Sequence, residues 1–348
     1  MSLVKYIVKR ILVMIPVLFG SLAMGFFLSR MMPGDPVLAI LAAQQLPRPS
    51  ISQINAMRRL LGFNQPVIVQ FFKYMADLFT GNWGTSISIV QNEPVWELIM
   101  QRLPRTIDIT IMSVLIASIV GIKVGVISAR HRNKLRDTSI RFIALVGVSI
   151  PVYFLGMLLQ FSISYQLSNV LGVPTLPATG FKDMRFEDPA YVTGFRTIDA
   201  FISGEWYMIS DYLIHLILPV FCLSFITLAG IARQTRSSML EVLEQDYIRT
   251  ARAKGCKEKD VINSHALKNS LIPTVTVIGL DFASLLGGAV LTESTFDLDG
   301  IGGLLIDCVR LIDYWVLTAL IFVITLMFVI VVLITDLIYA FLDPRIRY

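Results

Sequence analysis

Few of the residues on which enzyme chemistry usually depends occur in this chain. Cysteine and histidine each account for 3 of its 348 residues, and charged side chains make up 16%. The cysteines form no CxxC or histidine-paired spacing, which supports neither a disulfide framework nor a zinc site, and we expect them to be small buried residues. The scattered histidines favour packing or interface roles over metal ligation. These residues are Cys222, Cys256 and Cys308, and His131, His215 and His265.

A phosphate-binding loop of the GxxxxGK[ST] type is also missing, so the sequence predicts no P-loop ATP site in this chain. No Ser/His/Asp arrangement can be placed on one surface, although sequence distance alone does not exclude one. We therefore expect no catalytic residue, no metal ligand and no cofactor in the chain itself. The net charge of +5 comes from basic residues beside apolar stretches. That pattern indicates membrane topology and not a nucleic-acid-binding face.

Apolar residues are abundant instead. They make up 55% of the chain, a share typical of a protein that crosses a membrane several times. A stretch of about 20 apolar residues is long enough to span a bilayer. The expected spans are residues 11–28, 107–128, 140–167, 213–232, 272–291 and 315–341. The sequence thus predicts an all-α polytopic membrane protein with six transmembrane helices.

Basic residues cluster on one side of the expected spans. They include Lys9, Arg10, residues 130–136 and Arg345. By the positive-inside rule this side is the cytoplasm, so we expect both termini inside. No small-residue cleavage site follows the first span, and we interpret that span as a retained signal anchor.

Between the first two spans lies an expected extracytoplasmic segment, residues 31–105, which is too long for a simple connection. We expect a helix within it from Ser52 to Leu61, ending at Gly62. A second extracytoplasmic segment, residues 168–211, carries aromatic residues typical of a membrane interface. Neither segment specifies a ligand by itself.

Small residues recur at every fourth position of the second span, at Ser113, Ala117, Gly121, Gly125 and Ala129. Such a strip lets two membrane helices approach closely, and Gly121 with Gly125 forms a GxxxG pair. We favour helix packing within the subunit over a subunit interface.

The third span contains a proline after its first turns. Pro151 follows Ser149 and Ile150. Because proline frees a backbone carbonyl and bends a helix axis, we expect a kink in an otherwise continuous span.

The fifth span has two different faces. One is a strip of small residues, and the opposite one carries an aspartate near the middle of the bilayer. The two sets are Gly279, Ala283 and Gly287, and Asp281, Ser284 and Gly288. A bare carboxylate at that depth is costly, so we favour a wet translocation pathway beside Asp281. A protonated or hydrogen-bonded structural aspartate between helices is the alternative.

A long polar loop, residues 245–273, precedes this span and carries a helix-like pattern. Before Gly255, apolar residues recur at spacings of three and four, and a second short helix is expected after it. The apolar positions are Leu240, Leu243, Tyr247 and Ala251, then Val261, Ile262, His265 and Ala266. We expect a helix-glycine-helix elbow whose apolar face needs a partner protein to cover it. The charged residues just before it, including Arg233 and Arg236, are expected to form a solvated helix face.

Here the sequence resembles the permease subunits of ABC importers, whose cytoplasmic signature is Glu-Ala-Ala, three residues, Gly, nine residues, Ile, one residue, Leu-Pro. Ala251, Gly255 and Leu267 match this signature. The departures resemble the peptide and nickel importer branch, and they are Arg249, Thr250, His265 and Lys268. The resemblance implies that the loop is a coupling helix seated on an ATP-hydrolysing subunit. The residues expected to couple are Arg249, Thr250, Ala251, Gly255, Val261, Ile262, His265, Leu267 and Lys268.

Further motifs extend the resemblance along the chain. They are PGDP at 33–36, RLP at 102–104, SIP at 149–151, and the run ESTFDLDGIG at 293–302, in which Asp299 stands where proline is usual. These motifs resemble the first of the two permease subunits of peptide importers. The tail, residues 342–348, also resembles that subunit.

The resemblance implies a type I ABC importer permease fold and a role as half of a translocation pathway for di- or oligopeptides. The implied partners are a second homologous permease, two cytoplasmic ATPases that carry ATP and Mg, and an extracytoplasmic binding protein. The chain would lie among lipids of a prokaryotic cytoplasmic membrane and bind no nucleic acid. Nickel chelates, glutathione or oligosaccharides remain possible cargoes, and an ion-coupled secondary transporter remains the alternative class.

The expected organisation has four parts. Residues 1–30 form an N-terminal anchor helix, and residues 31–105 form the extracytoplasmic segment. Residues 106–341 form a transmembrane core of five helices that includes the coupling loop, residues 233–271. A cytoplasmic tail, residues 342–348, follows.

Overall fold

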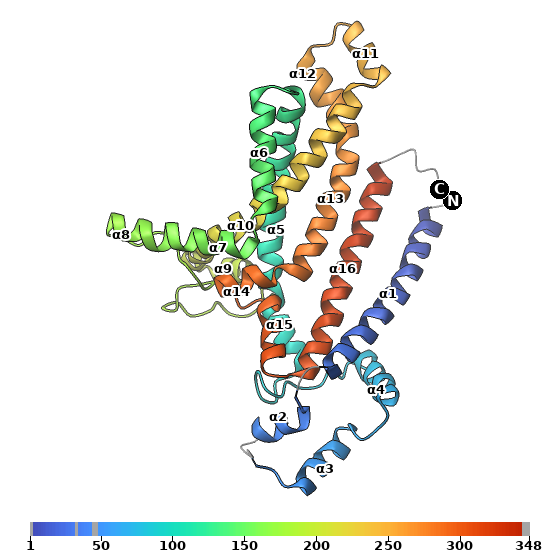
Figure 1. The fold of residues 1–348 in the computed structure, drawn as a ribbon, viewed down its shortest axis with the longest axis vertical. Helices are drawn as coiled ribbons and strands as arrows, with labels where there is room; N and C mark the ends of the chain where they lie inside the picture. The colour runs from blue at the N-terminus through green and yellow to red at the C-terminus, as the bar shows by residue number, and fades with distance from the viewer. Residues whose placement is uncertain (1–2, 32–33, 44–47, 343–348) are drawn as a thin grey trace.

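The fold is a bundle of long helices with short helices gathered at both ends (Figure 1). The structure is a computed structural model that describes residues 3–31, 34–43 and 48–342. Within these ranges the only β-type pairing is an isolated bridge between Thr85 and Pro94. The long helices are α1 (Leu3–Met31), α5 (Val95–Arg130), α10 (Trp206–Leu243), α13 (Leu267–Gly288) and α16 (Tyr314–Leu342). The predicted all-α polytopic architecture is confirmed.

Five helices of the described chain are long and apolar enough to cross a membrane, and a bent pair brings the number to six. Most of them extend past the expected spans. The helix α5 begins at Val95, well before residue 107, and α10 continues to Leu243, beyond residue 232. The polar residues at the start of α5 and at the end of α10 therefore belong to the same helices as the apolar spans.

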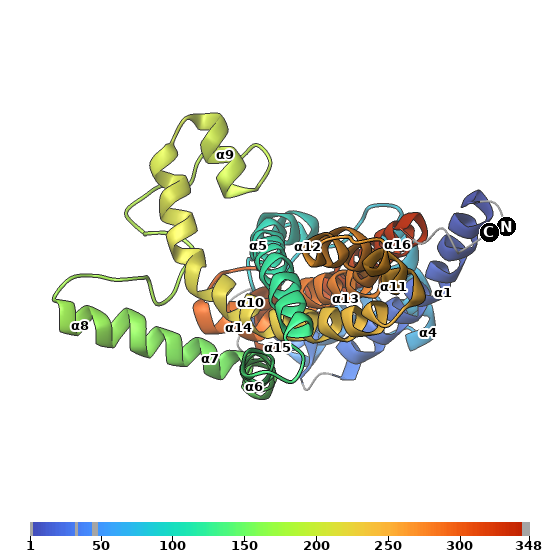
Figure 2. The same cartoon turned by 90° about the horizontal axis from the view of Figure 1, so that it is seen from above.

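The third expected span is not one kinked helix, and that prediction is wrong. The helix α6 (Leu135–Ser149) ends before Pro151, and the chain turns by 99° into α7 (Val152–Leu159). Ile150 adopts the extended conformation, with φ −85° and ψ 125°, which is the region favoured for a residue before proline. A π-helical segment (Gln160–Leu167) and α8 (Ser168–Leu171) continue α7 sideways, away from the bundle (Figures 1 and 2).

The segment between α1 and α5 folds into three helices at the end of the bundle opposite the polar loop (Figure 1). They are α2 (Pro36–Ala43), α3 (Ile51–Leu60) and α4 (Val67–Phe79). The helix α3 lies close to the range expected from the sequence. It begins with a capping box, because the Ser50 hydroxyl accepts from the Gln53 amide while the Gln53 side chain accepts from the Ser50 amide. The sequence analysis missed α4, which buries Phe71 and Leu78 against α1.

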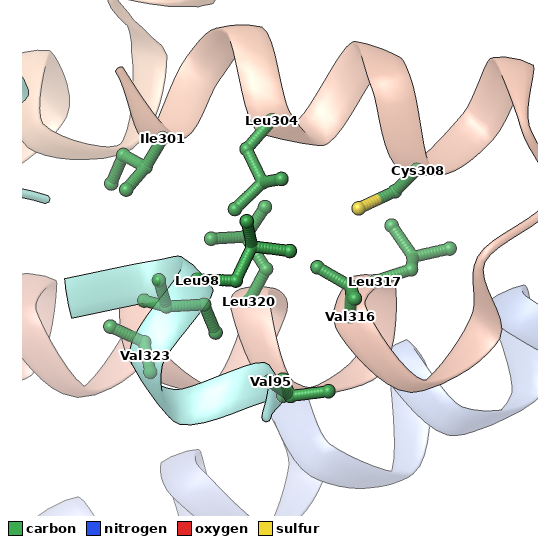
Figure 3. Packing of buried hydrophobic residues seen from close by; sticks show 11 residues of the cluster. Val95, Leu98, Ile301, Leu304, Cys308, Val316, Leu317, Leu320 and Val323 are labelled. Carbon is green, nitrogen blue, oxygen red and sulfur yellow. The ribbon is translucent and has the colours of Figure 1, made fainter. Parts of the chain in front are cut away.

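One part of the apolar core lies where α5, α15 (Ile301–Arg310) and α16 meet (Figure 3). Val95 and Leu98 of α5 belong to one buried cluster with Leu304 of α15 and Leu320 of α16, and Leu98 lies beside Leu320. Cys308 is buried in the same cluster. Cys222 is buried as expected, but Cys256 is exposed on the polar loop, so the expectation of a buried residue is wrong there.

The small-residue strip of α5 faces α10 of the same chain. A Cβ atom placed on Gly125 would lie 2.7 Å from the carbonyl oxygen of Ala232 and 2.7 Å from Cβ of Thr235. At Gly121 the nearest side chain is Ile231, at 3.0 Å, and Ala117 is fully buried. The strip thus lets two long helices approach within a single subunit.

The small face of α13 makes a similar contact with α16. A methyl group on Gly279 would collide with the side chain of Thr335, and one on Gly287 would lie 3.2 Å from Ile324. Ala283, between them, is fully buried. This contact turns the opposite face of α13 away from α16 and fixes where Asp281 and Ser284 lie.

Candidate functional site

The polar loop forms an elbow at one end of the bundle, defined here as residues 244–268 (Figure 1). The helix α11 (Asp246–Ala253) is followed by Gly255, whose φ of +80° lies in the left-handed region. Glycine adopts that conformation without steric cost, so it can reverse the chain here. The short helix α12 (Glu258–Asp260) and a π-helical segment (Val261–Ala266) then lead into α13.

The expected second helix of the elbow is not a separate element. A continuous helical stretch, Glu258–Gly287, includes both α12 and α13. The first expected helix is also divided, because α10 ends at Leu243 and α11 begins at Asp246. The three- and four-residue spacing of apolar residues continues across the break between α10 and α11, which is why the sequence suggested one helix.

Most of the apolar face of the elbow is covered by the chain itself, so the expectation that the whole face needs a partner protein is wrong, although Tyr247 remains 40% exposed. Val261 is fully buried and Ile262 is 5% exposed. They pack with Ile248 of α11, Met239 of α10 and Ala129 of α5. Ala129 lies far from the elbow in sequence, so the pattern of the loop alone could not reveal this contact, whereas Met239 lies just before the elbow on α10. Ala251 and Ala266 belong to the same buried cluster.

The outward face of the elbow is polar and basic. It includes Arg249, Thr250, Gly255, His265 and Lys268, all exposed. Leu267 is half-buried below them. The predicted coupling residues therefore fall into an exposed polar set and a buried apolar set that supports it from behind.

Two ion pairs hold the exposed face in shape. Arg252 donates from Nη2 and Nε to the carboxylate of Glu258, at 2.9 and 3.2 Å, and so links the two sides of Gly255. Arg249 pairs with Asp246 at 3.0 Å within α11. A two-point arginine–carboxylate contact fixes orientation as well as distance, so the turn at Gly255 is held in one geometry.

The α13 residues expected to line a pathway lie on the side away from α16. Ser284 is exposed and Asp281 is half-buried, while Ala283 between them is fully buried. The Oδ2 atom of Asp281 forms no hydrogen bond with any residue in the described part of the chain. Gly288 ends the helix. No described side chain supplies the partner that a buried structural aspartate would need.

A buried ion pair ties α6 to α10 near the elbow. Arg236 donates from Nε and Nη2 to the two carboxylate oxygens of Asp137, at 2.7 and 2.8 Å. Asp137 is fully buried and also accepts from Ser128 and from the backbone of Asn133. The expectation that Arg236 is part of a solvated face is therefore wrong, because its partner lies 99 residues earlier.

At the opposite end of α13, the motif at 293–302 forms a compact junction. Glu293 on α14 (Val290–Phe296) accepts from Thr106 Oγ1 at 2.6 Å, and from the amides of Gly302 and Gly303 at 2.7 and 3.2 Å. These two amides open α15, where a carboxylate is favoured by the helix dipole. Burial raises the pKa of the Glu293 carboxyl, and the hydrogen bonds from Thr106, Gly303 and Gly302 oppose that rise.

The junction also explains an unusual residue in this motif. Asp299 has a φ of +51°, which proline cannot adopt because its ring holds φ near about −65°. The Asp299 carboxylate instead forms ion pairs with Arg102, at 3.1 Å, and Arg105. The replacement of the usual proline is therefore matched by a local change in backbone conformation and by two arginines of α5.

A second carboxylate links the segment between α1 and α5 to the start of α16. Asp313 is fully buried and accepts through Oδ2 from the Ser86 hydroxyl at 2.7 Å and from the amides of Ile87 and Ser88. Sequence reasoning did not assign a role to Glu293, Asp137 or Asp313. Glu293 was visible in the motif, but nothing local pointed to the other two.

Within the described residues, no group of three histidine, cysteine, aspartate or glutamate side chains is placed to hold a metal ion. The cavities near the elbow and along α13 are lined by arginine, hydroxyl and apolar residues, and the second one also by Gln234 and Asp336. The arrangement thus offers two features: an exposed polar face on the elbow, where another protein could dock, and a polar strip on α13 at Asp281 and Ser284.

Two family models match almost the whole chain. Residues 121–348 match the inner membrane component of binding-protein-dependent transport systems, and residues 3–110 match the N-terminal part of the membrane component of such systems. The two matches cover both the α1–α5 region and the bundle that carries the elbow.

Individual relatives are similar over their full length. The dipeptide transport system permease protein DppB of Alkalihalophilus pseudofirmus is 42% identical over 99% of this chain and 100% of its own. DppB of Escherichia coli is 38% identical, with 99% of each chain covered. The oligopeptide transport system permease protein AppB of Bacillus subtilis is 36% identical, again over 99% of each.

Among solved structures, the fold resembles an inward-facing form of the MetNI methionine ABC transporter. The TM-score is 0.54, with 16% sequence identity, and the match covers 72% of this chain and 99% of the other. At that identity the likeness concerns the fold alone. With the two family models and the full-length relatives, it places the chain in the family of inner-membrane components of binding-protein-dependent transport systems.

Proposed function

We propose that this chain is one of two homologous but different permease subunits of an ABC importer of di- or oligopeptides. The supporting observation is its similarity, over the entire length, to permeases named for dipeptide and oligopeptide transport. The chain is a multi-pass inner-membrane protein and a transport subunit. The family works with a substrate-binding protein, and the ABC class supplies ATPase subunits.

The proposed orientation places the elbow and both termini in the cytoplasm. The first described residues of α1 and the last of α16 lie toward the same end of the bundle as α11 (Figure 1). The short helices of the 31–105 segment lie at the other end, where the binding protein would dock. The division at 1–30, 31–105, 106–341 and 342–348 is retained as part of this proposal, although residues 343–348 lie outside the described chain.

For coupling, we assign contact with the ATPase to the exposed side chains of the elbow. Arg249, Thr250 and His265 can form hydrogen bonds with a partner surface, and Lys268 adds a positive charge. Val261 and Ile262 would act indirectly, by holding α12 and α11 in place. ATP and Mg would bind to the partner subunits alone.

For transport, we assign the side of α13 that carries Asp281, Ser284 and Gly288 to the translocation pathway. The partner permease would supply the opposite wall. ATPase closure would displace the elbow, and rigid-body movement of α13 would open the pathway to one side of the membrane at a time.

Reconstitution tests the proposal directly. The chain would be placed in proteoliposomes with its genomic neighbours: the second permease, the ATPases and the binding protein. Dipeptide uptake that requires ATP and the binding protein is the expected result. Uptake of nickel chelates, glutathione or oligosaccharides but not of peptides would show that the proposed peptide cargo is wrong. Uptake by this chain alone, driven by an ion gradient, would refute the importer assignment and favour a secondary transporter.

A further inference from the structure

A groove between α6 and α10 lies close to the elbow but belongs neither to the elbow nor to the proposed pathway. Its cavity measures about 340 Å³, a size within the range of small-ligand sites. We call it the α6–α10 groove. Its lining combines apolar residues, among them Ala144, Leu145 and Val148, with three arginines.

Polarity changes along the length of this groove. Arg141 precedes Ala144 and Val148 on α6, and α6 starts at the same end of the bundle as the elbow. On α10, Arg233 follows Ala229 on the way to the elbow. At about 1.5 Å per residue, the apolar lining continues roughly 10 Å beyond Arg141 toward the middle of the bundle. The arginines therefore mark one end of the groove and the apolar side chains the other.

Two of the three arginine charges have no counter-ion. The Arg236 charge is neutralised by Asp137, through the two contacts of 2.7 and 2.8 Å described above. Arg141 and Arg233 are exposed, and neither forms an ion pair or a side-chain hydrogen bond with any residue of the described chain. Two guanidinium groups therefore lie at the mouth of an apolar groove with unused donors.

The groove opens at the margin of the bundle. The helix α6 packs on α10 and α5 but exposes Phe142, Ile143 and Val146, which do not line the groove. Both views place α6 at the edge of the group of long helices (Figures 1 and 2). Apolar side chains exposed at the depth of a membrane helix face lipid, so lipid can reach the groove from the bilayer.

From these observations we propose that the α6–α10 groove binds an anionic phospholipid of the inner leaflet. The phosphate would lie between Arg141 and Arg233, and an acyl chain would follow the apolar lining. Basic pockets between membrane helices on the cytoplasmic side are a known form of head-group site. The proposal rests on the orientation given under the proposed function. A free phosphate ion would use the arginines but leave the apolar half of the groove empty.

The site has a structural consequence for the elbow. The helix α10 leads directly into α11, and α6 is attached to α10 by the pair of Asp137 and Arg236. A lipid bound across the same two helices would add a second connection next to the elbow. Occupancy should therefore stiffen the α6–α10 pair.

The test measures lipid retention by the full-length chain, purified in mild detergent, using native mass spectrometry. Phosphatidylglycerol and phosphatidylcholine of the same acyl composition are added in parallel. We expect tighter retention of phosphatidylglycerol, with a loss of about fivefold for Arg141→Gln or Arg233→Gln and about 25-fold for both together. Arg132→Gln is the matched control, since that exposed arginine pairs with Glu244 outside the groove.

Several results would overturn the proposal. Equal retention of the two lipids, or an unchanged preference in the double variant, would exclude an anionic lipid site here. Competition by soluble glycerol phosphate as effective as that by phosphatidylglycerol would indicate a simple phosphate site. Cross-linking of a cysteine at Leu145 to the second permease, in membranes and in a Cys256→Ser background, would show that a protein subunit fills the groove. Lipid retention is measured without transport, so its failure leaves the importer assignment intact.

Discussion

Replacing Glu293 by alanine should loosen the junction that follows α13. The carboxylate accepts three hydrogen bonds, from Thr106 at 2.6 Å, Gly302 at 2.7 Å and Gly303 at 3.2 Å. Glu293 is 1% exposed, so water cannot take over these bonds without entering the junction. The two glycine amides follow that of Ile301 in the first turn of α15, and no other acceptor for them is found in the described chain.

The cost can be worked out from these contacts. A buried donor left without an acceptor costs about 1–3 kcal/mol. Two backbone amides lose their acceptor, and the Thr106 hydroxyl loses the acceptor of its own proton but continues to accept from the Ile301 amide at 3.0 Å. We therefore expect Glu293→Ala to lower the free energy of unfolding by about 3–5 kcal/mol. Glu293→Gln retains a carbonyl acceptor for Gly302 and should cost about 1–2 kcal/mol.

The assay is the fraction of monodisperse protein that remains after heating in detergent. We expect the midpoint temperature of this loss to fall most for Glu293→Ala and less for Glu293→Gln. Glu187→Ala is the control, because Glu187 is exposed and has no partner among the described residues, and such changes usually cost less than about 0.5 kcal/mol. A midpoint for Glu293→Ala equal to that of the control would refute the role assigned to the carboxylate.

Three further outcomes are expected. Gly255→Pro should abolish transport and substrate-stimulated ATP hydrolysis while leaving membrane insertion intact, because proline cannot adopt φ +80°; normal uptake would contradict the elbow's role. Val261→Asp should destabilise the elbow by about 3 kcal/mol or more, because it buries an unpaired charge, and limited proteolysis should then cut the chain at the elbow. His265→Asp, on the exposed face, should reduce only substrate-stimulated ATP hydrolysis. Equal proteolysis of the two variants would contradict the burial of Val261. A cysteine at Ser284 should react with aqueous thiol reagents and one at Ala283 should not, and equal inertness would remove the pathway assignment.

The membrane spans could be predicted from the sequence because their signal is local. A run of apolar residues reports its own burial in lipid, and the first and last spans were placed to within a few residues of the apolar parts of α1 and α16. The capped helix α3 was found for the same reason, since its start and end signals lie within the helix. Local information also identified the family motifs.

What could not be predicted depended on contacts between distant segments. Proline at position 151 predicts a bend, but the 99° turn results from the extended conformation of Ile150 and from the packing of α7 against α14. The apolar face of the elbow suggested a missing partner, because Ala129 of α5 could not be placed beside it. The partner of Arg236 was hidden for the same reason.

The buried face of the elbow changes how movement can pass from an ATPase to the membrane. The helical stretch Glu258–Gly287 runs without a break from the elbow past Asp281, and its whole length is about 45 Å. Pro273 lies inside it and does not end the helix. A displacement applied near His265 must then reach Asp281 as movement of one rod. The chain can yield only where the rod ends, at Gly255 and at Ala289, and just beyond Ala289 the Glu293 junction resists movement. We therefore expect the rod to tilt about its end at Ala289, so that the end of the pathway nearest the elbow moves furthest.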